Sequence, residues 1–444
     1  MRMIVVVSHS SSSRLKYASK VLFEQILGVD WRIVESDKNL TTGDVTIHYG
    51  RDGGDGAVNV PSSGLLFEKD IRDVKMKSGK WDELPTLFAG EGDIPFDIFS
   101  AIFFLITRYE EYLPHKTDRY GRFIAEESVA FQHGFIERPL VDEWAMKLKE
   151  LLAEKFHMSF PSRKFQYIST VDIDSAFAYR YKGFMRTAGG FGKDILAMDL
   201  KNASNRLKTI SGIKPDAFDT YDHMVTLHKE FGVPGIFFYL LADYGLNDKN
   251  VPITSRKFRE TIKSMDDYFE SGIHPGYMSN KEPHRLKEEK SRLEKIIHRK
   301  VVKSRQHFLM LSMPETYVRL LQEGVEHDYS MGFASQVGFR MSTCTEVPFY
   351  NLRTDQITPL MLHPFGVMDA TLNMYLELTP EQGLAKAKDV VDRVKAVEGT
   401  FISLWHNESL SEEWHWKGWL TVFEQLLSYA SSQRTKEAAQ KVLI

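Results

Sequence analysis

The segment Tyr167-Ile-Ser-Thr-Val-Asp-Ile-Asp-Ser-Ala176 decides how the rest of the chain is interpreted. Its β-branched and apolar residues predict a strand, and Asp172 and Asp174 occupy alternate positions where that strand should end. Alternate residues of a strand point to the same face, so the two carboxylates should lie side by side. Because an unpaired carboxylate is costly to bury, the pair either binds a metal and moves protons or caps a turn at the strand end.

Further short strands alternate with helices along the rest of the chain. The predicted strands are 235–241, 272–274, 301–307 and 400–405, and the predicted helices are 221–231, 255–269, 286–298, 314–324 and 380–397. This alternation indicates a parallel barrel or a wound sheet, in which chemistry takes place at the carboxyl ends of the strands. The polar residues at those ends are Asp172, Asp174, His274, Arg305, His307 and His406.

Composition limits the possible functions. The 444 residues are 43% hydrophobic and 26% charged, which is typical of a soluble globular chain with two or three domains. A formal net charge of -3 gives no basic field for nucleic acid. The single cysteine, Cys344, excludes an internal disulfide and a cysteine-cluster metal site, and we expect it to be a packed core residue. No stretch approaches the ~20 apolar residues of a membrane span, and we expect a cytoplasmic protein.

A smaller α/β domain is predicted to occupy positions 1–160. Strands are expected at 4–7, 31–34 and 44–48, and helices at 14–27, 96–112 and 140–156. The serine run 10–13 lacks the glycines and lysine of a phosphate-binding loop and is interpreted as a helix cap. The stretch Pro161-Ser-Arg-Lys164 is the expected boundary, so that the second domain comprises residues 165–444.

An inserted segment, 181–214, follows the two aspartates and interrupts the alternation. Glycines break it, and the stretch 195–210 has amphipathic helical spacing. We interpret the insertion as a lid beside the site. A helix lying on a membrane surface is the alternative, against which its mixed charge counts.

In chain order, five short sequences resemble the motifs of the polysaccharide deacetylases, carbohydrate esterase family 4. They are Thr170-Val-Asp-Ile-Asp174, His274-Pro-Gly-Tyr-Met-Ser-Asn280, Ser304-Arg-Gln-His307, Asp328-Tyr-Ser-Met-Gly332 and Leu404-Trp-His406. The resemblance extends from about position 165 to position 407. The chain also looks like an uncharacterised bacterial branch that adds an N-terminal α/β domain, because of Pro61-Ser-Ser-Gly-Leu-Leu-Phe-Glu68 and Arg108-Tyr-Glu-Glu-Tyr-Leu-Pro114.

This resemblance implies a deformed (β/α) barrel that hydrolyses an N- or O-acetyl group on a saccharide with zinc or a similar divalent ion. In the family the metal polarises the acetyl carbonyl and a water, an aspartate removes the proton, and a histidine protonates the leaving group. Carried over by motif, Asp172 matches the base, Arg305 the residue that orients the base, and His406 the acid. His274 matches a metal ligand.

Two departures from the family pattern concern the metal ligands. Ile173 separates two aspartates that are adjacent in the family, and Asp174 is still expected to bind the metal. The second histidine of the motif is replaced by Met278, a poor zinc ligand, so Ser279, Asn280 or His307 must take its place. We favour His307 because imidazole suits zinc, the alternative being a core histidine or one that supports a ligand.

Several residues have weaker claims. Arg340 either meets an anionic substrate group or is structural, and His363 and Asp369 could line the pocket. Trp405, Trp414 and Trp416 are sugar-stacking candidates, although core packing is the more ordinary role. Two other functions compete with the deacetylase: a saccharide-binding protein that has lost turnover, and a metal-free glycoside hydrolase, for which the aspartates lie too close together.

Overall fold

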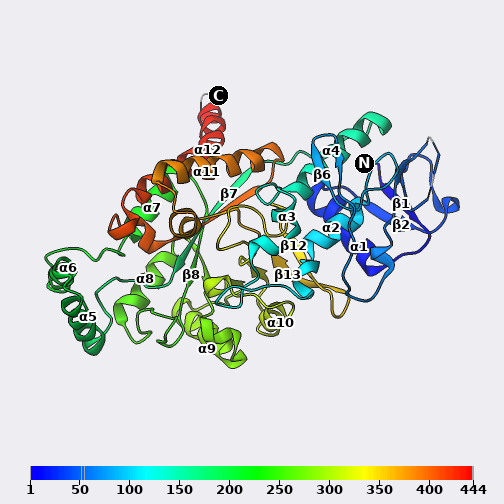
Figure 1. The fold of residues 1–444 in the computed structure, drawn as a ribbon. Helices are drawn as coiled ribbons and strands as arrows, with labels where there is room; N and C mark the ends of the chain where they lie inside the picture. The colour runs from blue at the N-terminus through cyan, green and yellow to red at the C-terminus, as the bar shows by residue number, and fades with distance from the viewer. Residues whose placement is uncertain (1, 52, 55, 443–444) are drawn as a thin grey trace.

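Two sheets organise the chain (Figure 1). The computed structural model describes residues 2–442 apart from 52 and 55, and side chains as far as residue 431. The smaller sheet is parallel, has the order β2-β1-β3-β4, and consists of β1 (Ile4–Ser8), β2 (Trp31–Val34), β3 (Val45–Tyr49) and β4 (Val58–Val60). A separate hairpin is formed by β5 (Gly79–Trp81) and β6 (Leu84–Thr86).

The larger sheet has nine strands in the order β12-β13-β11-β10-β9-β8-β7-β15-β14. Neighbouring strands are parallel except β12 and β13. The strands are β7 (Gln166–Ile173), β8 (Gly235–Tyr239), β9 (Glu270–Ile273), β10 (Lys303–Ser304), β11 (His327–Asp328), β12 (Val347–Asn351), β13 (Gln356–Leu362), β14 (Val367–Met368) and β15 (Thr400–His406).

The mixed α/β fold with a large parallel sheet confirms the coarse prediction. Among the described residues, β12 and β14 are the edge strands and do not pair with each other, so the barrel itself stays a prediction. Within that same described part of the chain, no helix combines the length and apolar character needed to cross a bilayer.

Helices pack on both sheets. Those of positions 1–160 are α1 (Ser13–Ser19), α2 (Ile98–Ile106), α3 (Val129–Gln132) and α4 (Leu140–Phe156). The rest are α5 (Phe184–Leu196), α6 (Leu200–Ile210), α7 (Tyr221–Phe231), α8 (Arg256–Asp266), α9 (Pro283–Ile297), α10 (Glu315–Gln322), α11 (Pro380–Ala396) and α12 (Trp419–Val442). Ser12 caps α1 by accepting from the Leu15 amide, as the helix-cap interpretation predicts.

One hydrophobic core joins the N-terminal segment, positions 1–160, to part of the larger sheet. It contains the side chains of α1, α2 and α4 together with Tyr317, Phe349 and Tyr350. The Tyr17 hydroxyl also donates to the carbonyl of Pro348 on β12 at 2.7 Å. The division at 161–164 therefore stays a prediction, because the two parts share buried surface.

Candidate functional site

The strand register brings the polar residues together at the carboxyl ends of the strands of the larger sheet. His406 of β15 lies opposite Asp172 of β7, and Ile273 of β9 lies opposite Ser304 of β10. His274 and Arg305, which follow Ile273 and Ser304, therefore leave the sheet at the same level. Parallel strands present their carboxyl ends to one edge, so residues far apart in the sequence converge there.

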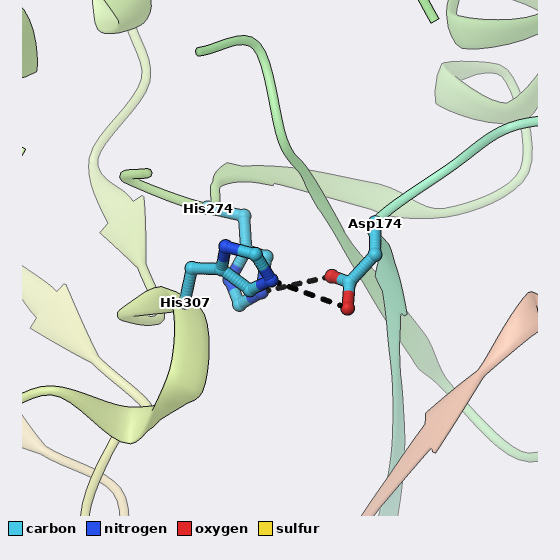
Figure 2. A group of neighbouring side chains, drawn as sticks. All are labelled: Asp174, His274 and His307. Carbon is cyan, nitrogen blue, oxygen red and sulfur yellow. Dashed lines mark ion pairs between the residues drawn. The ribbon is translucent and has the colours of Figure 1, made fainter. Parts of the chain in front are cut away.

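Asp174, His274 and His307 form a compact cluster (Figure 2). The Nε2 atom of His274 lies 3.2 Å from Asp174 Oδ1, and that of His307 lies 3.4 Å from Asp174 Oδ2. Their possible ligand atoms all lie within 4.8 Å of one another. Ile173 is buried in the core, so the extra residue leaves both aspartates facing the same cavity.

Three histidines of the site are anchored through Nδ1. The Nδ1 atom of His274 donates to the Arg305 carbonyl at 2.6 Å, and that of His307 donates to Asp248 at 2.8 Å. His406 donates in the same way to Asp369 at 2.8 Å. In a neutral imidazole each Nε2 then carries a lone pair.

The Nε2 atoms of His274 and His307 face the carboxylate of Asp174, and an imidazole lone pair and a carboxylate oxygen repel unless a proton or a cation lies between them. Nitrogen and oxygen donors arranged in this way are those that zinc binds, and histidine ligands typically donate their other ring N–H to a carboxylate or carbonyl. The residues present therefore fit a divalent metal.

The electrostatics of the cluster favour positive charge. Burial disfavours a charged His307 ring, but Asp174 and Asp248 outweigh burial and raise the pKa of His307 to about 9. Burial opposes ionisation of Asp174 as well, yet His307, His274 and His406 hold its pKa well below the ordinary value. Without a metal, the site is thus stabilised by a proton on His307.

Asp172 is held by a buried arginine. Nη1 of Arg305 donates to Asp172 Oδ1 at 3.0 Å and to the Thr170 hydroxyl at 2.7 Å, while its Nε donates to the Tyr329 carbonyl. The Arg305 guanidinium also lies 4.7 Å from the centre of the Phe238 ring. Because several partners fix the arginine, the Asp172 carboxylate is fixed as well.

His406 also lies near Asp174, with its Nε2 3.9 Å from Asp174 Oδ2. Burial lowers the tendency of the ring to be charged, but Asp369 outweighs burial, with further contributions from Asp174 and Asp172, and the pKa of His406 is raised well above its ordinary value. His406 therefore holds a proton that it can give to a neighbouring group.

A cavity of about 240 Å³ opens over the cluster. Asp172, Asp174 and the three histidines line its polar side. Its other walls are mainly apolar and aromatic, and include Phe308, Leu309, Met368, Met374, Tyr375, Leu404 and Trp416. The cavity thus combines a polar reacting end with apolar walls, as ligand pockets commonly do.

The N-terminal segment contributes Arg122 to this cavity. Asp118 holds the Arg122 side chain at 2.6 Å, and the guanidinium donates to the Phe308 carbonyl at 3.0 Å. Phe308 has a positive φ of 59° and directly follows His307. Arg122 therefore braces a backbone conformation that L-residues rarely adopt, next to a proposed ligand.

The structure corrects several sequence-based details. His307 belongs to a 3-10 turn, His307–Leu309, rather than to a strand, because β10 ends at Ser304. Ser279 donates to Glu289 at 2.6 Å and is engaged away from the cluster, and the Asn280 carbonyl accepts from Arg319. Arg340 is structural: it forms a two-bond contact with Glu111.

The structure gives the other weaker candidates different roles. Asp369 supports His406, whereas His363 stacks on Tyr329 and is not among the residues lining the cavity. Trp405 is buried and Trp416 lines the cavity wall. Cys344 is buried, as predicted.

Sequence reasoning missed Asp248. It lies in the loop after β8, where it accepts from both His307 and the Tyr277 amide. A Cβ on Gly276 would lie 2.5 Å from the Ala242 Cβ and 3.0 Å from an Asp248 carboxylate oxygen, so a larger residue here would push against this loop. The sequence offered one signal: Asp248 is an aspartate in the loop that follows a predicted strand, and such loops lie at the carboxyl ends of the strands.

Comparison with known proteins gives two kinds of match. Residues 3–157 match the model of a family of unknown function, DUF7033. No curated protein matches the sequence.

Among solved structures, the chain is similar to a candidate polysaccharide deacetylase from Mycobacterium smegmatis, with a TM-score of 0.41 and 13% identity over 64% of this chain and 94% of that one. It is also similar to a polysaccharide deacetylase from Bacillus cereus, with a TM-score of 0.31 and 9% identity over 62% and 89% of the two chains. A CE4 family pseudoenzyme from Bacillus anthracis matches with a TM-score of 0.26 and 12% identity over 59% and 60%. The function proposed below is therefore based on the side chains of the site.

Proposed function

We propose that this chain is a metal-dependent hydrolase that removes an acetyl group from a saccharide or a saccharide precursor. The observation that carries the proposal is the convergence of two anchored imidazoles on Asp174, with the possible ligand atoms of the three residues all within 4.8 Å of one another. The motif order from Thr170 to His406 supports the same reaction and the barrel that accompanies it.

Asp174, His274 and His307 would hold the metal, with zinc the preferred ion for this donor set. When bound, a divalent ion supplies Lewis-acid polarisation of the acetyl carbonyl and makes a nearby water more acidic. Asp248 and the Arg305 carbonyl keep the two histidine rings in the required tautomer.

Asp172 would act as the general base. Its carboxylate lines the cavity and is held by Arg305, so it accepts a proton from the attacking water in a fixed position. Arg305 acts through Asp172 by keeping the carboxylate oriented.

His406 would act as the general acid. Its raised pKa keeps a proton on the ring, and Asp369 fixes the ring through Nδ1, so Nε2 delivers the proton to the departing nitrogen or oxygen. The base and the acid lie opposite each other on neighbouring strands, close to the proposed ligand Asp174. The cavity is small, and we expect it to hold the acetyl group and the adjoining sugar ring, with the rest of the saccharide outside.

The direct experiment is to measure acetate release from a panel of N- and O-acetylated saccharides, before and after treatment with a chelator. We expect release by the metal-loaded protein, loss on chelation, and loss in His406→Ala. His284→Ala, which changes a well-exposed histidine outside the site, should behave as wild type. Saccharide binding without any acetate release, with or without metal, would instead show the inactive binding protein.

A further inference from the structure

The α5–α6 hairpin projects from the edge of the molecule opposite the N-terminal segment, in dark green in Figure 1. It is the insertion that follows β7, and the catalytic proposal uses none of its residues. Its two helices pack mainly on each other, so the contacts between them decide which side chains face outward.

Polar groups join the two helices. Asp194 on α5 is buried, and it accepts from Arg206 at 2.7 Å and from Asn202 at 2.7 Å, both on α6. The Arg206 guanidinium also lies 4.7 Å from the centre of the Tyr179 ring. A Cβ on Gly190 would come within 2.6 Å of that guanidinium, so the glycine makes room for the arginine. The contact between α5 and α6 is therefore centred on an ion pair rather than on apolar side chains.

Apolar side chains face outward instead. Phe184 and Met185 are each 86% exposed at the start of α5, and Leu196 is 87% exposed at its end. Residues 184, 185, 188, 189, 192, 195 and 196 are apolar or glycine and recur at helical spacing, so they form one stripe along α5. Met198, Leu200, Leu207, Ile210 and Ile213 extend this exposed apolar surface across the turn and α6. Large exposed apolar surfaces of this kind mark interaction sites.

The charge of the hairpin indicates which kind of partner it binds. Residues 181–214 contain seven lysines and arginines against two aspartates, in a chain whose formal net charge is -3. Both aspartates serve the hairpin itself, since Asp194 holds Arg206 and Asp199 caps α6. Asp194 is buried, so the exposed charge consists of three lysines, Lys193, Lys201 and Lys208, against Asp199 alone, and it is predominantly positive.

We propose that the α5–α6 hairpin binds the surface of an anionic lipid bilayer, with the apolar stripe among the headgroups and the lysines against lipid phosphates. Amphipathic helices with an apolar face and a basic border bind in this way, through buried apolar area and attraction to anionic lipid. The other possible occupant, a second copy of the chain, would bring the same basic surfaces together.

The test is co-sedimentation of the full chain with vesicles of phosphatidylcholine, alone or mixed with phosphatidylglycerol. Wild type should sediment with the mixed vesicles and far less with phosphatidylcholine alone, and added salt should weaken binding. Phe184→Ser, Met185→Ser and Leu196→Ser combined should lower the affinity by about 100-fold, because three large apolar side chains no longer enter the bilayer. Lys193→Gln, Lys201→Gln and Lys208→Gln combined should remove the preference for anionic lipid.

A matched control changes three exposed apolar side chains elsewhere, Phe131→Ser, Tyr268→Ser and Ile357→Ser, and should bind as wild type. His274→Ala should also bind as wild type, which separates lipid binding from the proposed catalysis. Wild type that stays in solution with both kinds of vesicle would overturn the proposal. So would a wild-type dimer, seen by light scattering, that the triple apolar variant converts to a monomer without any vesicle binding.

Discussion

Two buried arginine–carboxylate clusters in this protein contain the same chemical groups but differ in their surroundings. Arg340 meets Glu111 through two bonds of 2.8 and 2.6 Å, and Arg108 donates to Glu111 at 2.7 Å, between the N-terminal segment and the larger sheet. Arg305 meets Asp172 at the sheet edge, where a cavity and several histidines lie beside it. Arg340 lines a cavity of about 210 Å³, but Glu111 is not among its lining residues, whereas in the second cluster the carboxylate of Asp172 itself lines a cavity. We therefore call the first cluster closed and the second open. Burial and charge alone do not identify a functional site.

Breaking the closed cluster should have the largest effect on stability. Arg340→Leu leaves the Glu111 carboxylate buried with one partner fewer, and we expect the free energy of unfolding to fall by about 3–5 kcal/mol. Urea denaturation measures this, and metal content should be unchanged. Arg353→Leu, which breaks an exposed ion pair with Glu315, should cost less than about 1 kcal/mol. Similar losses in the two variants would contradict the comparison.

Breaking the open cluster should affect turnover instead. Asp172→Asn keeps the shape of the side chain but removes the proposed base, and we expect kcat for acetate release to fall by about 100- to 1,000-fold. Metal content and unfolding free energy should change little. Asp267→Asn, at an exposed position, is the control. An Asp172→Asn variant with normal kcat would remove Asp172 from the mechanism.

Glu111 of the closed cluster and His307, which lies beside the open one, should respond to pH in opposite directions. Burial opposes ionisation of Glu111, but Arg340 and Arg108 lower its pKa to about 2, so this contribution to stability is complete above pH ~4.5 and is lost as pH falls towards 2. In metal-free protein the pKa of His307 is about 9, so its contribution is complete below pH ~6.5 and is lost as pH rises through 9.

Urea denaturation of chelated protein across this pH range measures both effects. Metal affinity should rise over the interval in which metal-free stability falls, because metal binding displaces the His307 proton. A metal affinity that is independent of pH between 6.5 and 9 would show that His307 is not a ligand.

The smallest effect should come from the support of a ligand. Asp248→Asn weakens the hold on His307 Nδ1, and we expect metal affinity to fall by about 10- to 100-fold with the fold retained. Competition with a chelating dye measures this affinity. Asp243→Asn, in the same loop but well exposed, should keep wild-type affinity, and equal losses in both variants would assign the effect to the loop.

Regular elements could be predicted closely because their periodicity is local. The predicted helices 140–156 and 221–231 coincide with α4 and α7, and β15 follows the predicted strand 400–405. The predicted helix 96–112 is wrong beyond Ile106, because Arg108 takes a φ of 54° and its guanidinium reaches Glu111. Arg340, far along the chain, holds the same carboxylate, so tertiary contacts override the local pattern here.

The candidate site could be predicted only in part. The positions of Asp172, Asp174, His274 and His406 at predicted strand ends indicated a site, because polar residues there interrupt an apolar pattern. Asp248 belongs to a loop whose path depends on Gly276 and the neighbouring strands, and no periodic signal marks it.

The central claim is that Asp174, His274 and His307 bind a divalent metal, and metal content tests it most directly. Purified wild-type protein, dialysed against zinc and then against metal-free buffer, should retain one ion per chain by elemental analysis. His274→Ala and His307→Ala should retain almost none while unfolding cooperatively, and His284→Ala should match wild type. Folded wild-type protein without metal, or equal zinc content in wild type and both site variants, would contradict the account.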